Sequence, residues 1–166
     1  MLHKSFIALD KLGLIGRAKA HCDIPCGIYD PAPALIAAHS IVRLMDILHQ
    51  AHTEREDGLG KSNLLARSVI RKEEEAEKVK QEVRVIWGDY FKGKLLEEYP
   101  EVHGLVHEIM LKASSCKQDV HREDALALVE LVNQFAELFW MTKGIESKRV
   151  SAPYAPGLPM IQPVLS

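Results

Sequence analysis

Apolar side chains recur every three or four residues through most of the chain, which is the spacing of a helix with one buried face. The first such stretch follows Asp30 and Pro31, which suit the N-cap and the first helical position. A charged connection with two glycines separates it from a longer stretch, which we expect to be capped by Ser62 or Asn63 and to end near Tyr90. The pattern therefore predicts two consecutive long helices.

Two further helical stretches follow in the second half of the chain. After a short helical turn at residues 95–98, Pro100 can open a third helix. The fourth begins near Asp119 and ends at Lys143 and Gly144, a basic residue followed by a helix-ending glycine. Four helices joined by short connections predict an all-α fold, an antiparallel up-and-down four-helix bundle over residues 32–149.

The last seventeen residues, 150–166, break this pattern. Four prolines fall within them, and proline cannot continue a helix (Pro153, Pro156, Pro159 and Pro163). We expect a Pro-rich extended tail, which either contacts a neighbouring subunit through its apolar residues or stays disordered.

Composition excludes several classes of function. The chain has 21 basic and 23 acidic side chains without a long basic cluster, so it shows no nucleic-acid-binding pattern. No segment approaches the ~20 apolar residues of a membrane span, which predicts no membrane partner. Three cysteines are too few for a disulfide framework, and Cys116 lies far from the other two.

A candidate metal site precedes the first helix. His21, Cys22 and Cys26 place an imidazole and two thiols within six residues. If His21 were the first residue, its free amine, the amide nitrogen of Cys22 and the two thiolates would define a square plane, with the imidazole free to bind axially. Such coordination suits divalent nickel or copper, whereas zinc prefers a tetrahedron.

The segment HCDIPCGIYDP, residues 21–31, closely resembles the nickel-binding hook of the nickel-containing superoxide dismutases. The resemblance extends, in the family order, to VIWGDYFK at 85–92, YPEVH at 99–103 and FWMTK at 139–143. It implies one nickel ion per subunit, alternating between divalent and trivalent states, an enzyme that converts superoxide to dioxygen and hydrogen peroxide, and a homohexamer of four-helix bundles.

Residues 1–20 precede the histidine that begins the mature chain in that family. Asp10 and Lys11 interrupt the apolar residues of this segment, which argues against a secretory signal. We therefore expect a removable leader, cut by a processing protease in the cytoplasm, with export as the alternative. The predicted division is leader 1–20, nickel hook 21–31, bundle and tail.

The resemblance also implies roles around the metal. Tyr29 resembles the tyrosine that screens the open face of the metal, Asp23 could order the hook by accepting a hydrogen bond, and Tyr90 is a candidate neighbour of the site. Family members orient the axial imidazole with a glutamate and an arginine, but the matching positions here are Ala37 and Glu75. Glu75 either replaces the missing carboxylate, across the bundle or a subunit contact, or is simply solvated.

Two other functions remain open at this point. Cys22 and Cys26 could form a thiol-disulfide switch, although their spacing is not the usual CxxC. The same residues could instead belong to a carrier that only stores nickel or copper.

Overall fold

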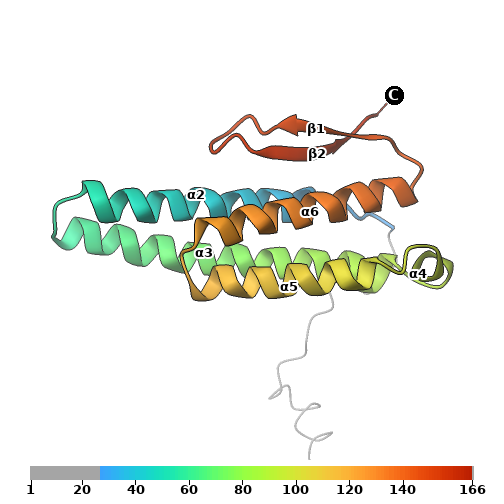
Figure 1. Cartoon of the computed structure of the whole chain (residues 1–166), viewed down its shortest axis with the longest axis horizontal. Helices are drawn as coiled ribbons and strands as arrows, with labels where there is room; N and C mark the ends of the chain where they lie inside the picture. The colour runs from blue at the N-terminus through green and yellow to red at the C-terminus, as the bar shows by residue number, and fades with distance from the viewer. Residues whose placement is uncertain (1–26, 166) are drawn as a thin grey trace, which may run out of the picture.

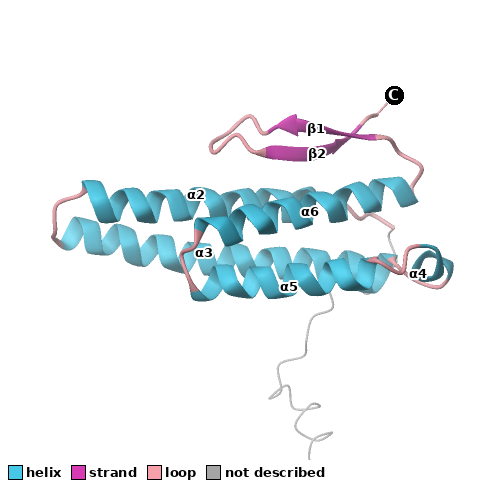
Figure 2. Ribbon diagram, viewed as in Figure 1, coloured by secondary structure: helices cyan, strands magenta, loops and turns pink. Residues whose placement is uncertain are grey.

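The computed structural model describes residues 27–165, and its four long helices form one bundle (Figure 1). These are α2 (Ala32–Glu54), α3 (Leu59–Val85), α5 (Val102–Gln118) and α6 (Arg122–Thr142). They alternate in direction, with α2 and α5 each packed against both α3 and α6 (Figure 2). The predicted antiparallel four-helix bundle is therefore confirmed. Over residues 27–165, none of the helices combines the length and apolarity needed to cross a membrane.

The core is largely aliphatic, with a group of small side chains on α2 and aromatic ones on α6. Ala34, Ala37 and Ala38 on α2 are fully buried, which lets the neighbouring helices approach its first turns closely. Phe135 and Phe139 on α6 are also fully buried and lie one helical turn apart. The apolar stripes read from the sequence therefore do face the interior.

The start of α3 differs from the prediction. The helix begins at Leu59 rather than at a cap on Ser62 or Asn63, and the Ser62 amide donates to the Gly58 carbonyl over 3.0 Å. Lys61 stabilises this extra turn, since its Nζ donates to the carbonyls of His52 and Arg55 and to Asp57. These hydrogen bonds of Lys61 to the preceding connection could not be predicted from the sequence pattern.

A π-helical turn directly follows the end of α3. Residues Ile86–Tyr90 form a single π-helical turn, closed by a 3.3 Å bond from the Phe91 amide to the Ile86 carbonyl. The short helix α4 (Lys94–Glu98) then leads into α5 at the same end of the bundle (Figure 1). π turns are rare and concentrate at functional sites, which draws attention to Tyr90.

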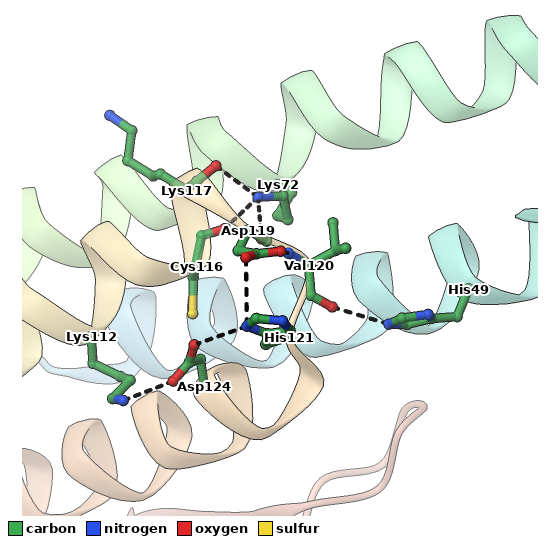
Figure 3. Close-up of polar contacts among 9 residues, drawn as sticks. All are labelled: His49, Lys72, Lys112, Cys116, Lys117, Asp119, Val120, His121 and Asp124. Atoms are coloured by element: carbon green, nitrogen blue, oxygen red, sulfur yellow. Dashed lines mark hydrogen bonds and ion pairs between the residues drawn. The ribbon is translucent and has the colours of Figure 1, made fainter.

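A buried lysine attaches α3 to the end of α5. The Lys72 ammonium donates to the backbone carbonyls of Cys116, Lys117 and Asp119, the last two over 2.9 Å (Figure 3). These carbonyls have no partners within α5, because a helix leaves its last four unsatisfied. Burial lowers the pKa of Lys72, but the three acceptors hold the ammonium in place.

The chain ends in a β-hairpin rather than a free tail. Strands β1 (Ser147–Ser151) and β2 (Pro159–Pro163) pair antiparallel and lie over α2 and α6 (Figure 2). Met160 and Ile161 are buried, and Asn133 of α6 donates to the Pro159 carbonyl over 2.9 Å and accepts from the Ile161 amide over 2.8 Å.

The prediction of an extended segment did not include this pairing. Pro159 and Pro163 occupy the two ends of β2, where the missing amide costs few ladder hydrogen bonds. The helical bundle also ends before residue 149, the predicted boundary. Its last helix ends at Thr142, and β1 already begins at Ser147.

Candidate metal centre

The predicted hook ligands precede the part of the chain that the structure describes. His21, Cys22, Asp23 and Cys26 all lie outside residues 27–165. The first described residue, Gly27, has a φ of +70°, a left-handed conformation that favours glycine. The backbone at Gly27 therefore adopts this conformation directly after Cys26, within the hook.

The start of α2 anchors the last residues of the hook. The Ala32 amide donates to Asp30 Oδ1 over 2.8 Å, so Asp30 satisfies a free amide of the first turn as predicted. Pro31 is buried directly after it. Only a few residues thus separate the predicted ligand Cys26 from a fixed helix end.

Tyr29 and Tyr90, both predicted to lie near the metal, come together at this end of the bundle. Their ring centroids are 5.8 Å apart, and both side chains are half-buried. Tyr29 comes from the segment before α2, whereas Tyr90 comes from the π turn after α3. The fold therefore brings together two tyrosines that are far apart in the sequence.

Residues at the end of α6 fix the position of Tyr90. Its hydroxyl shares a 2.8 Å hydrogen bond with Thr142 Oγ1, which in turn donates to the Phe139 carbonyl over 2.7 Å. The Tyr90 ring also packs 4.9 Å from the Phe139 ring. These contacts hold the phenol at the hook end of the bundle.

A cation missed by the sequence reasoning lies beside these rings. Lys143 Nζ is 4.9 Å from the centroid of Tyr90 and 5.1 Å from that of Phe139. Contacts of this kind are favourable because the face of an aromatic ring carries negative charge. Lys143 was read only as a helix-ending residue, yet its spacing of four from Phe139 could have indicated the contact.

The described part of the chain offers no competing metal site. Residues 27–165 contain no group of three or more His, Cys, Asp or Glu side chains arranged to hold a metal. Cys116 is fully buried, and burial raises the pKa of its thiol to about 11, so the thiolate that a metal needs is disfavoured. The imidazole and the two remaining thiols of the hook, a donor set that suits nickel, are then the best candidates.

Glu75 lies away from the two tyrosines within the subunit. It is buried on α3 and pairs with Arg71, whose Nη2 is 2.7 Å from its Oε1. Fifteen residues separate it from Tyr90, or roughly 22 Å along a helix. Glu75 therefore belongs to a different part of α3 from the end that holds Tyr90.

A hollow of about 310 Å³ adjoins Glu75 between α2, α3 and the hairpin turn. His39, Arg43, Arg71 and Tyr154 line it with Glu75. His39 is 1% exposed, its ring packs edge-on against Tyr154, and neither ring nitrogen has a well-formed hydrogen bond. Burial lowers the pKa of His39, partly offset by the nearby Pro159 carbonyl.

The fold and the sequence together define a class: a helical-bundle protein preceded by a short N-terminal segment that carries one imidazole and two thiols. Residues 16–143 match the family model described as nickel-containing superoxide dismutase. The chain belongs to this family. The match includes the hook and all four long helices but ends before β1 and β2.

Curated relatives agree with the family match. The chain is 36% identical over 124 residues to "Superoxide dismutase [Ni]" of Streptomyces coelicolor, which covers 75% of this chain and 88% of the relative. The corresponding protein of Streptomyces seoulensis is 35% identical over 127 residues, with 76% and 91% covered.

Solved structures show the same fold. Native nickel superoxide dismutase matches with a TM-score of 0.65 at 34% identity, covering 75% of this chain and 99% of the other. A structure whose nickel ligation corresponds to the oxidized state matches with the same TM-score, identity and coverage.

Proposed function

We propose that this chain is a nickel-dependent superoxide dismutase that holds one nickel ion per subunit through His21, Cys22 and Cys26. The observation that carries the proposal is the HCDIPCGIYDP segment, which leads directly into a bundle whose end presents Tyr29 and Tyr90, in a member of this family. Bound nickel would supply the one-electron oxidation and reduction that dismutation of superoxide requires.

The two tyrosines would control access to the hook. Tyr29 follows Cys26 by three residues and contacts Tyr90, which Thr142 holds by its hydroxyl. This pair would restrict the approach of larger anions to the hook. Asp23, inside the hook, would accept a hydrogen bond and order its turn.

Positive charge beside the tyrosines would favour an anionic substrate. Lys143 lies over the Tyr90 ring, and Lys92 is exposed just after the π turn. Cations near an access route raise the local concentration of an anion, an effect that salt weakens. The proposed substrate, superoxide, carries one negative charge.

Residues 1–20 would form a leader that a protease removes in the cytoplasm. Cleavage after Ala20 frees the amine of His21, which the proposed square plane needs as a ligand. The mature protein would then comprise the hook 21–31, the bundle and the C-terminal hairpin.

Subunits would assemble as a homohexamer in which neighbouring chains shield the hooks. A segment with so few apolar residues cannot bury a metal by itself, so contacts with other subunits would limit solvent exchange. Sedimentation of the nickel-loaded mature protein tests this assembly.

Glu75 would orient the imidazole of His21 for nickel binding. Arg71 already holds its carboxylate, and buried carboxylates of this kind commonly accept a hydrogen bond from a metal-bound histidine. The separation from Tyr90 means that the hook must fold back along α2 and α3, or that the carboxylate serves the hook of a neighbouring subunit.

A pair of variants tests this role of Glu75. Glu75→Gln should lower nickel affinity or turnover roughly 10–100-fold and change the metal spectrum. Glu74→Gln removes the exposed neighbour that also pairs with Arg71, and it should change neither. Equal effects of the two substitutions would contradict the role.

Cysteine variants test the proposed function itself. Cys22→Ser and Cys26→Ser should each abolish stoichiometric nickel binding and dismutation, whereas Cys116→Ala should leave both intact because its buried thiol is not a ligand. Dismutation that survives Cys22→Ser would contradict the ligand assignment. Nickel bound by the intact mature protein without turnover would instead indicate a carrier.

A further inference from the structure

An open apolar hollow of about 900 Å³ lies between α5 and α6, outside the proposed metal centre. Its apolar lining comes from both helices and includes Leu105, Leu138 and Met141. Met141 is 53% exposed, so it presents a large apolar side chain at the surface of this hollow. We call this surface the α5–α6 groove.

The charged residues that line the groove are all acidic. Glu101, Glu108 and Glu137 line it, and none of its nine lining residues is basic. Glu137 has a distant partner, Arg149 at 3.8 Å. Glu101 and Glu108 form no ion pair with any residue among 27–165. An apolar surface with free carboxylates at its edge suits a segment that is both apolar and basic.

One segment of this same chain has that composition. Residues 1–20 contain four basic side chains and one acidic one (Lys4, Lys11, Arg17, Lys19 and Asp10). Their apolar residues are large and frequent, including Phe6, Ile7, Leu9, Leu12, Leu14 and Ile15. The segment therefore complements the groove in both polarity and charge.

The groove is also within reach of this segment. Tyr29 packs on Tyr90, whose hydroxyl bonds Thr142, the residue next to Met141 in α6. The six residues 21–26 can span at most about 20 Å when extended. Residues 1–20 are thus tethered to the end of the bundle that carries the groove.

We propose that residues 1–20 bind in the α5–α6 groove before cleavage. The tether raises their effective concentration, so weak apolar and ionic contacts suffice for binding. Cleavage after Ala20 removes the tether and vacates the groove. The proposal rests on the leader role of residues 1–20 but not on nickel chemistry.

Titration of a synthetic peptide of residues 1–20 into the protein beginning at His21 tests the proposal. Methyl NMR of the methionines should show a saturable shift of the Met141 signal, with no shift of Met45, which is fully buried. The full chain should show the shifted Met141 signal without added peptide. An unshifted Met141 in both experiments would overturn the proposal.

Charge variants test the ionic contribution. Glu101→Lys with Glu108→Lys should weaken peptide binding about tenfold or more, and a peptide with its four basic residues changed to Glu should bind this variant better than the wild type. Two changes at the other end of the bundle, Glu54→Lys with Glu56→Lys, keep the net charge equal and should leave binding unchanged. Equal weakening by both pairs would show that only net charge matters and would overturn the groove.

A further measurement separates this proposal from subunit contact and from the dismutase function. If the Met141 signal depends on protein concentration and not on the peptide, a second copy of the chain occupies the groove and the proposal fails. The peptide titration uses metal-free protein and does not depend on nickel. Peptide binding can therefore be absent while the nickel-loaded protein still dismutates superoxide.

Discussion

At the scale of single residues, His39 shows most directly how burial sets chemistry. The helical spacing of Leu35, His39 and Val42 places this imidazole on the apolar face of α2. The structure buries it under Tyr154 without a well-formed hydrogen bond. A buried imidazole favours its neutral form, because the charged form loses its hydration.

This burial predicts a pH dependence of folding stability. The pKa of His39 in the fold lies below 6.5, so the unfolded chain takes up a proton first as the pH falls. The contribution to stability is present above pH 6.5 and is lost as the pH falls below that value. Urea unfolding of the metal-free protein should therefore lose less stability between pH 7.5 and 5.5 in His39→Leu than in wild type.

His107→Leu is the matched control for this experiment. His107 is exposed on α5, so its removal should leave the pH dependence close to that of the wild type. An identical pH dependence in His39→Leu and His107→Leu would contradict the assigned role of His39.

The proposed metal ligands are the residues that a local sequence pattern indicates most directly. His21, Cys22 and Cys26 are close in sequence, so a local pattern suffices to indicate a site. The partners of Tyr90 could not be predicted in the same way, because Thr142 and Lys143 reach it from a helix that begins more than thirty residues later. Such contacts depend on how the helices pack.

At the scale of elements, the long apolar stripes, the start of α2 and the end of α6 were predictable, whereas the start of α3 was not. The buried faces of α2 and α6 follow from apolar spacing alone, but the start of α3 depends on the bonds of Lys61 to the preceding connection. The hairpin also depends on tertiary contacts, since Asn133 bonds both sides of Met160 in β2.

Lys72 should stabilise the junction between α3 and α5. Lys72→Met removes the donor to three carbonyls at the end of α5 and should lower the free energy of unfolding by roughly 1–3 kcal/mol. Urea denaturation measures this loss. Lys78→Met, an exposed change on the same helix, should cost less than about 0.5 kcal/mol. A Lys72→Met variant as stable as that control would contradict the stabilising role of Lys72 at the end of α5.

Asn133 should hold the hairpin against α6. Asn133→Leu removes both hydrogen bonds to β2 and should increase hydrogen exchange of the β1 and β2 amides by roughly tenfold, while α2 and α3 stay protected. Gln134→Leu changes the exposed neighbour and should have little effect. Unchanged exchange in the hairpin of Asn133→Leu would show that apolar contacts alone hold it.

At the scale of the whole molecule, the bundle acts as a scaffold for a short N-terminal segment. The family match spans the hook and the four helices, while the hairpin lies beyond residue 143. The hairpin covers α2 and α6 (Figure 1). Its turn residues Tyr154 and Ala155 line the hollow beside His39 and Glu75. The molecule therefore adds its own C-terminal element to the shared fold.

Residues 21–26 are proposed to form the nickel site only when His21 is the first residue. The most direct test compares superoxide dismutation by two nickel-treated proteins, one beginning at His21 and one retaining residues 1–20. We predict activity in the trimmed protein alone, because only its His21 amine is free to bind the metal. Equal activity in both proteins would contradict the role of the amine, and nickel bound without activity in the trimmed protein would contradict the enzyme.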